Sequence, residues 1–202
     1  MKHLILFLAL VATANVAAQK YTARKAVPAD TIDQAIVEQV IDNVRQNSCY
    51  MAQEVIAVPD ADAVTLYQRA LQAFSDFSGT GNANTHIDYS DKETATVIYK
   101  NVYFLCTIYQ FMAGWNMYGD FTIKIRCKNG RAQATVTLSR LTAEQSGRRQ
   151  VFDIAGVAKS YPTSKPGRQK RASKAFIEID RAANILLAAI RAKLILPIND
   201  DF

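Results

Sequence analysis

The stretch FTIKIRCKNGRAQATVTL, Phe121 to Leu138, has the alternation and the central turn of a β-hairpin. Asn129-Gly130 is the residue pair preferred for a two-residue type I′ turn, because both central residues of that turn need positive φ. A two-residue turn here sets the register, so that Lys128 faces Arg131. The pairs that follow are Cys127 with Ala132, Ile125 with Ala134, Ile123 with Val136 and Phe121 with Leu138.

This register divides the side chains of the hairpin between two faces. The apolar face carries Phe121, Ile123, Ile125, Ala134, Val136 and Leu138. The polar face carries Thr122, Lys124, Arg126, Gln133, Thr135 and Thr137. We therefore expect one face to pack against helices and the other to meet water.

Length and composition fit a single folded domain with extensions. The chain has 202 residues, of which 50% are hydrophobic and 21% charged, enough for a core and too apolar for disorder. The net charge is +6. From Arg140 onward the sequence holds 12 Lys and Arg against 6 Asp and Glu, whereas residues 19–139 hold 11 against 12. The basic character therefore belongs to the C-terminal third.

Residues 1–18, MKHLILFLALVATANVAA, have the pattern of a secretory signal peptide cut before Gln19. A basic start precedes an apolar run from Leu4 to Val11, and small residues stand at Val16 and Ala18. The apolar run is shorter than the ~20 residues that span a bilayer, which favours a cleaved signal over an anchor. The mature protein is expected to be exported, either periplasmic, envelope-associated or extracellular, and not transmembrane.

Residues 19–50 are predicted to form an N-terminal extension with one amphipathic helix, capped by Asp30. The apolar stripe of that helix consists of Ile32, Ile36, Val37, Val40, Ile41 and Val44. Residues 51–202 are predicted to form the main α+β domain. It begins with a strand over 55–58 and a helix over 64–77, for which Asp60 or Asp62 offers an N-cap.

The second half of the domain begins with β-rich sequence from Ile87 to about Leu105 and continues through the hairpin. Residues 142–172 contain several Gly and Pro and are interpreted as a long basic loop, with one short strand near 151–154. The final helix is expected to begin near Ser173 and to end before Pro197.

Three cysteines follow the signal: Cys49, Cys106 and Cys127. An odd number leaves at least one thiol free or bonded to another chain. A disulfide between Cys106 and Cys127 is one alternative, and buried free thiols that behave as small apolar groups are the other.

The order of these segments resembles a secreted Bacteroidetes family, domain of unknown function 4468. The resemblance rests on a Val-rich strand closing in Pro59, the helix LYQRALQAF, the strand DKETATVIYK, and the quoted hairpin followed by a terminal helix. It covers roughly residues 54–141. It implies a fold similar to the TATA-binding protein, a curved antiparallel sheet of about five strands backed by two helices, and here also an N-terminal helix. It implies no activity.

Catalytic motifs are missing from the sequence. His86 is the only histidine after the signal, and the three cysteines lack zinc-site spacing. We find no phosphate loop, dinucleotide fingerprint or nucleophile elbow. Asp88, Asp91 and Glu93 cluster where a turn is predicted, so a hydrolase with a carboxylate site is an alternative that nothing selects. We expect a non-enzymatic protein without cofactor or metal.

Two binding surfaces are predicted instead. The polar hairpin face offers donors and positive charge to an acidic protein, glycan or envelope component, although such a face is often only solvated. Its candidate residues are Thr122, Lys124, Arg126, Arg131, Gln133 and Thr135. In the second, Trp115 and Tyr118 stack on sugar rings, unless they cap the core.

The ligand and the oligomeric state are left open. Nucleic acid is not expected for an exported protein. The basic run Lys165–Lys174 is either a solvated loop, a protease site or a contact for anionic surfaces.

Overall fold

A computed structural model of the chain describes residues 29–79, 85–110 and 113–196. The chain falls into two compact units, residues 1–35 and 36–202. Helix α2 (Ala29–Asn47) begins in the first unit and ends in the second. The predicted signal peptide and the Asp30 cap lie outside the residues whose side chains are described.

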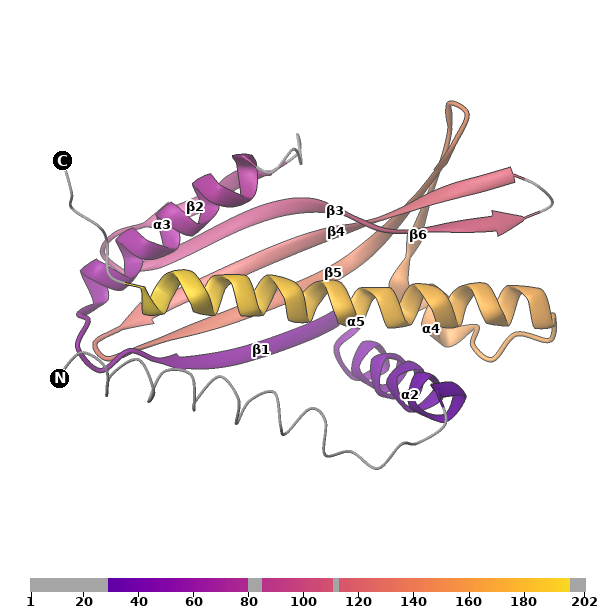
Figure 1. The fold of residues 1–202 in the computed structure, drawn as a ribbon, viewed down its shortest axis with the longest axis horizontal. Coiled ribbons are helices and arrows are strands. Elements are labelled where there is room, and N and C mark those ends of the chain that lie inside the picture. The colour runs from indigo at the N-terminus through magenta and orange to yellow at the C-terminus, as the bar shows by residue number, and fades with distance from the viewer. Residues whose placement is uncertain (1–28, 80–84, 111–112, 197–202) are drawn as a thin grey trace, which may run out of the picture. The chain divides into compact units, whose positions relative to one another are not determined.

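The second unit is built on one antiparallel sheet of six strands, in the order β1-β5-β4-β3-β2 with β6 also beside β5 (Figure 1). The strands are β1 (Tyr50–Ala57), β2 (His86–Asp91), β3 (Thr96–Gln110), β4 (Ala113–Lys128), β5 (Arg131–Gln145) and β6 (Arg148–Asp153). One edge of β5 pairs with β1 and, farther along, with β6. The predicted α+β class is confirmed, with six strands in place of about five.

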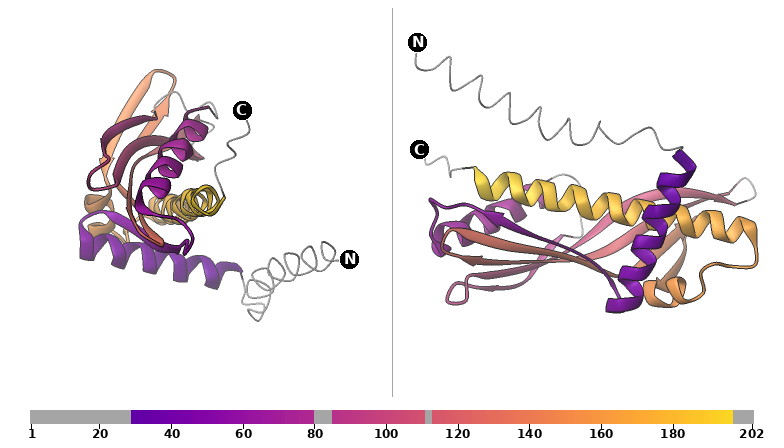
Figure 2. Two further views of the ribbon diagram at one scale, coloured as in Figure 1. Left: turned by 90° about the vertical axis from the view of Figure 1, so that its left-hand side faces the viewer. Right: turned by 90° about the horizontal axis from the view of Figure 1, so that it is seen from below.

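Two long helices cover one face of the sheet. α3 (Ala63–Gly79) and α5 (Pro166–Ile195) contact each other and the central strands, and the sheet curves around them (Figure 2). The largest fully buried side chains come from both layers: Tyr99, Phe121, Phe176, Leu66, Ile123, Ile125, Leu138, Ile154, Ile179, Leu186, Ile190 and Leu194. Each such side chain contributes roughly 1.5–3 kcal/mol by leaving water, so this layer contact holds the fold together.

The hairpin register predicted from the sequence is confirmed at every pair, from Lys128 opposite Arg131 to Phe121 opposite Leu138. All six residues of the predicted apolar face are buried, and all six of the polar face are at least partly exposed. The hairpin therefore has one buried face and one solvent-exposed face, as the alternation of its side chains requires.

The predicted type I′ turn is wrong. Of the two central residues, only Gly130 has a positive φ, of 76°, whereas a type I′ turn needs positive φ at both. Asn129 is used elsewhere: its Oδ1 accepts a hydrogen bond of 2.9 Å from the backbone N–H of Ala63, at the start of α3. The turn is also held by Val58 N–H donating to Gly130 O (2.8 Å) and by Gly130 N–H donating to Ala61 O (2.9 Å). Contacts with the β1–α3 connection thus decide the conformation of the turn.

Helix α3 begins at the N-cap that the sequence offered. Asp62 Oδ1 accepts a hydrogen bond of 2.7 Å from the backbone N–H of Thr65. This hydrogen bonding lowers the pKa of Asp62, because it stabilises the carboxylate. The sequence therefore predicted this helix start correctly.

Residues 142–172 are not a long loop, and that prediction is wrong. β5 continues to Gln145, β6 forms a second hairpin with it, and the short helix α4 (Ile154–Lys159) follows. α5 starts at Pro166, earlier than the expected Ser173. Proline was interpreted as a breaker, but at the first helical position its fixed φ suits a helix and its missing N–H costs nothing.

Helix α2 contributes the four buried side chains Val37, Val40, Ile41 and Val44 to the core. It also covers part of the free edge of β1. The Asn43 amide donates to Met51 O (2.7 Å) and accepts from Met51 N–H (2.8 Å), as a neighbouring strand would. The C-terminal part of this helix is thus a structural element of the second unit.

All three cysteines are free, so the alternative of a Cys106–Cys127 disulfide is wrong. Cys106 pairs with Met117, and Cys127 lies ten residues farther along β4. Ten residues of strand span roughly 33 Å, far beyond the roughly 7 Å between Cα atoms that a disulfide tolerates.

Candidate functional site

The outer face of the sheet carries a row of four side chains, three of them polar, across four strands near the β4–β5 turn. Val55 of β1 lies opposite Gln133 of β5, which lies opposite Arg126 of β4, which lies opposite Thr96 of β3. The next pair toward the turn is Lys128 with Arg131. Because facing residues of neighbouring strands share a face, these side chains are gathered by the register alone.

A pocket of about 490 Å³ lies over this row. The described residues that line it are Val55, Thr94, Thr96, Arg126, Cys127, Lys128, Arg131, Ala132 and Gln133. A second, more open depression of about 650 Å³ adjoins it and shares Lys128 and Arg131. We call the first of these the hairpin pocket.

The β2–β3 turn forms one wall of the hairpin pocket. Thr94 Oγ1 donates to Asp91 Oδ2 (2.8 Å), and Glu93 N–H donates to Asp91 Oδ1 (2.9 Å). These bonds lower the pKa of Asp91, since they stabilise its ionised form. Cys127 N–H donates to Ala95 O (2.9 Å), which ties the turn to β4. The wall is therefore held in place by both local and cross-strand bonds.

The hairpin pocket is strongly positive. Arg126, Lys128 and Arg131 are exposed, and none of them forms an ion pair or a side-chain hydrogen bond within the described part of the chain. Among the described residues that line either depression, Glu93 is the only carboxylate, and it belongs to the second one. The three cations are therefore available to an external anion.

The lining of the hairpin pocket offers hydrogen-bond donors but no base. Two guanidinium groups, an ammonium, two threonine hydroxyls and an amide can all donate. The remaining titratable group is the Cys127 thiol, whose pKa burial raises to about 11, so it is protonated at neutral pH. This set of groups suits recognition of an anion more than acid–base chemistry.

The structure brings half of the predicted polar-face residues into the pocket. Arg126, Arg131 and Gln133 line it. Lys124 and Thr135 form the next cross-strand pair away from the turn, and Thr122 stands one pair farther. These three residues extend the polar face of the hairpin and do not line the pocket.

The predicted aromatic site is not formed. Trp115 and Tyr118 lie on β4 and not on a loop, and an odd spacing along a strand places them on opposite faces. Trp115 packs against the core, whereas Tyr118 contacts the half-exposed Phe104 with ring centroids 5.7 Å apart. Trp115 and Tyr118 therefore cannot stack on one sugar.

Lys128, Thr94 and Thr96 were missed as site residues. Lys128 was detectable, because the predicted register already placed it opposite Arg131. Thr94 comes from the β2–β3 turn and Thr96 from the first position of β3, and no local pattern reveals how these residues meet β4.

The candidate carboxylates are occupied by structural bonds. Asp88 forms an ion pair with Lys100 (3.0 Å), and Asp91 holds the β2–β3 turn. Within the described ranges, no group of three or more His, Cys, Asp or Glu is placed to hold a metal ion. The helices of those same ranges include none that is long and apolar enough to cross a bilayer.

Comparison with known proteins gives a fold and no activity. Residues 53–142 match the model of a family described as domain of unknown function (DUF4468) with TBP-like fold. A crystal structure of a DUF4468 family protein from Bacteroides ovatus is similar with a TM-score of 0.59 and 9% identity, covering 76% of this chain and 90% of that one. A TBP-like protein from Parabacteroides distasonis gives a TM-score of 0.49 and 8% identity, covering 72% and 94%. No curated protein matches this sequence. At these identities the likeness concerns the fold alone.

Proposed function

Because residues 53–142 match the family model of DUF4468, which is described with a TBP-like fold, and a fold by itself carries no function, we propose a function from the chain's own surface. The protein is an exported, non-enzymatic binding module that holds an anionic ligand in the hairpin pocket. The ligand is a phosphate, sulfate or carboxylate group displayed by a protein, a glycan or another envelope component.

The observation that carries this proposal is the convergence of three unpaired cations on one cavity. Arg126, Lys128 and Arg131 line a space of about 490 Å³ together with hydroxyl and amide donors. Arginine presents a planar fork of donors that matches the oxygens of carboxylate and phosphate. A multivalent anion in the cavity can therefore form several charge-assisted bonds at once.

The register adds a second argument. Lys128 and Arg131 lie directly opposite each other on the same face. Like charges in this position destabilise a sheet, so the pair is unfavourable in the absence of a ligand. A bound anion would relieve that repulsion.

Export is supported by the signal pattern of residues 1–18. The expected mature protein begins at Gln19. N-terminal sequencing of the protein purified from the periplasmic or extracellular fraction of its own cells tests this part of the proposal, and an uncleaved N-terminus in the cytoplasm contradicts it.

The ligand proposal is tested by calorimetric titration with inorganic pyrophosphate as the probe. The double variant Arg126→Gln/Arg131→Gln is compared with Lys100→Gln/Arg140→Gln, which removes the same charge elsewhere on the sheet. Charge-assisted hydrogen bonds are worth about 1.5–3 kcal/mol each, so the first variant should bind at least tenfold more weakly. The control should bind nearly as well as the wild type. Equal losses in both variants would show general electrostatics, and absence of binding to the wild type would refute the pocket.

A further inference from the structure

A second cationic surface lies at the other end of the sheet, around the start of α5. Between residues 154 and 177 the chain has six Lys and Arg and no Asp or Glu. The six residues are Lys159, Lys165, Arg168, Lys170, Arg171 and Lys174. They follow one another from the end of α4, through the connection, to the third turn of α5. We call them the α5 basic surface.

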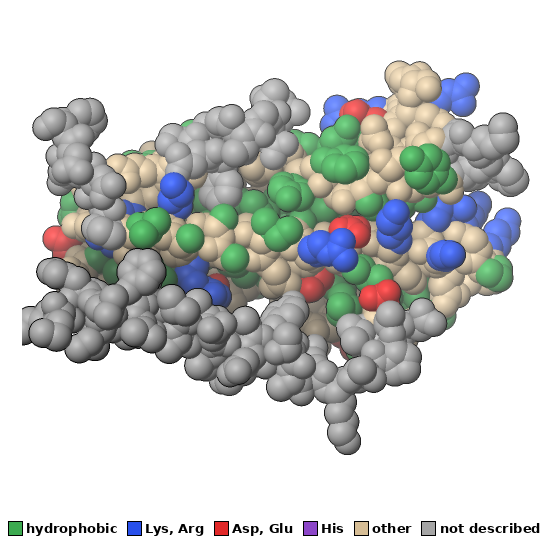
Figure 3. Space-filling view, viewed as in Figure 1, with side chains coloured by type: hydrophobic (Ala, Val, Ile, Leu, Met, Phe, Trp, Pro, Cys, Tyr) green, Lys and Arg blue, Asp and Glu red, His purple; other side chains and the backbone are tan. Residues whose placement is uncertain are grey.

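The α5 basic surface is accessible and poorly neutralised. Lys159, Lys165, Arg168 and Lys170 are exposed and have no ion pair or side-chain hydrogen bond among the described residues. In space-filling view, blue side chains gather over the N-terminal half of α5, on the right of Figure 3. Positive potential therefore reaches the solvent from several turns at once.

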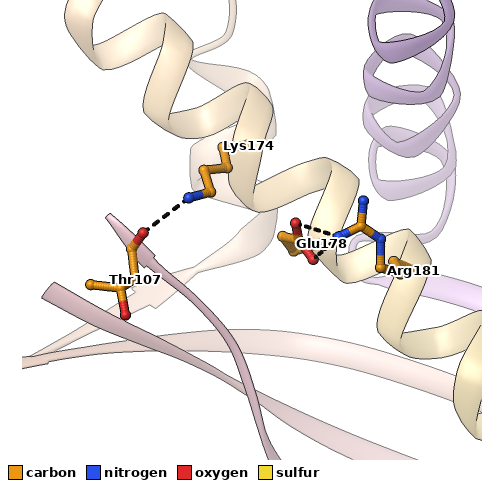
Figure 4. A network of polar contacts seen from close by, with 4 residues as sticks. All are labelled: Thr107, Lys174, Glu178 and Arg181. Atoms are coloured by element: carbon orange, nitrogen blue, oxygen red, sulfur yellow. Dashed lines mark hydrogen bonds and ion pairs between the residues drawn. The ribbon is translucent and has the colours of Figure 1, made fainter. Parts of the chain in front are cut away.

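The nearest carboxylates along the chain already have partners. Asp153 Oδ2 accepts from Gly156 N–H (2.9 Å) at the start of α4. Glu178 accepts two hydrogen bonds from Arg181, the shorter of 2.8 Å (Figure 4). Among the described residues, neither carboxylate forms an ion pair with a member of the α5 basic surface.

Helix stability does not explain this placement. α5 has no acidic residue in its first turn and no side-chain cap. Cations near a helix N-terminus oppose the helix dipole, which favours negative charge there. Lys165 and Arg168 therefore stand where they weaken α5, which points to a role in contact with something outside the chain.

A hydrogen bond connects the α5 basic surface to the end of β3. Lys174 Nζ donates to Thr107 O (3.0 Å), which joins α5 to the far end of β3 (Figure 4). Two residues farther along β3, the Tyr109 side chain is 75% exposed. Because its neighbour Ile108 is buried in the core, Tyr109 lies on the face of the sheet opposite α5 and is not part of the α5 basic surface.

We propose that the α5 basic surface docks on a membrane that contains anionic lipids. Clusters of four to eight Lys and Arg on an amphipathic helix bind anionic lipid headgroups. The signal pattern of residues 1–18 also leads the protein toward a membrane and away from nucleic acid. This docking is independent of ligand binding in the hairpin pocket.

Co-sedimentation with lipid vesicles tests the proposal. The full mature chain should sediment with phosphatidylcholine vesicles that contain phosphatidylglycerol and remain in solution with phosphatidylcholine alone. The triple variant Lys165→Gln/Arg168→Gln/Lys170→Gln should bind about a hundredfold more weakly, since each cation contributes roughly fivefold. High salt should release the wild type, because screening shortens the reach of charge to roughly 3 Å at about 1 M.

A matched variant separates docking from net charge. Lys92→Gln/Lys100→Gln/Arg140→Gln removes three charges from the sheet and should keep the affinity within about fivefold of the wild type. Circular dichroism of each variant establishes that it is folded.

Four results would overturn the docking proposal. They are absence of sedimentation with anionic vesicles, equal binding to neutral vesicles, and equal losses of vesicle affinity in the two triple variants. The fourth is release of the protein from vesicles by duplex RNA when the RNA supplies a lower concentration of negative charge than the lipid. The last result would identify a nucleic acid as the better partner.

Discussion

Replacing Arg126 should stabilise the protein, although the residue lines the proposed ligand site. Arg126 is surrounded by like charges: Lys124 and Lys128 stand two residues away on the same face of β4, and Arg131 stands diagonally across on β5. Side chains in these relations have Cβ atoms about 7 Å apart, so we take charge separations of about 8 Å. Arg126→Gln keeps the length of the stem and removes only the charge.

The size of the effect follows from Coulomb's law with screening. At about 8 Å in water, one pair of unit charges costs about 0.5 kcal/mol before screening. Three such pairs, screened with Debye lengths of about 30 Å at 0.01 M and about 8 Å at 0.15 M, sum to about 1.2 and about 0.6 kcal/mol. At about 1 M salt the sum falls to about 0.1 kcal/mol. The variant should therefore gain stability at low salt and lose that advantage as salt rises.

Urea unfolding of wild type and variant at these three salt concentrations measures the difference. Adding pyrophosphate extends the assay: ligand at a hundred times its Kd stabilises the wild type by about 2.7 kcal/mol and should stabilise the variant much less. A variant that is less stable than the wild type, a salt-independent difference, or equal stabilisation of both proteins by pyrophosphate would each refute the reasoning.

Other predictions concern the framework that positions the site. Asn43→Ala removes the 2.7 and 2.8 Å hydrogen bonds to the backbone of Met51 and should lower the free energy of unfolding in urea by about 1–3 kcal/mol. Asn43→Asp keeps the acceptor for Met51 N–H and should lower the free energy of unfolding less. Gly119→Ala would place Cβ 2.5 Å from Leu138 Cδ1 and should lower stability by about 1–3 kcal/mol, and an unchanged midpoint would show that the core yields. The buried Cys127 thiol has its pKa raised from 9.0 to about 11, so burial favours the protonated form; its stabilising contribution should be complete below pH 9.0 and disappear as pH rises through about 11. Alkylation of Cys127 in the folded protein should stay slow until the upper pH, and fast labelling near neutrality would contradict its burial.

The sheet was predictable where local signals agreed. Alternation and the Asn129-Gly130 pair both pointed to the same register, and the buried side chains of the hairpin are those of the predicted apolar face. The turn conformation was not predictable, because Asn129 bonds to Ala63, 66 residues away in sequence. Only the folded chain brings that partner near.

The region after β5 was misinterpreted because glycine and proline have more than one structural meaning. Gly147 sits in a tight turn with φ of 80°, and Pro166 opens a helix. Both were taken as signs of a loop. The hairpin pocket was half predictable for a similar reason: Arg126 and Arg131 follow from the register, whereas Thr94 and Thr96 depend on how a distant turn meets β4.

The unbroken length of β4 has a consequence for how the two basic regions behave. The strand runs over 16 residues, and Arg126 lies near its C-terminal end. The neighbouring strand β3 contacts Lys174 near the other end of the β3–β4 pair. Thr107, the β3 residue of that contact, lies opposite Asn116, ten residues from Arg126, which corresponds to about 33 Å and is several times the roughly 8 Å over which charge acts at physiological ionic strength. Binding at one region should therefore not change the electrostatic potential at the other. The changes in free energy caused by substitutions in the two regions should be additive.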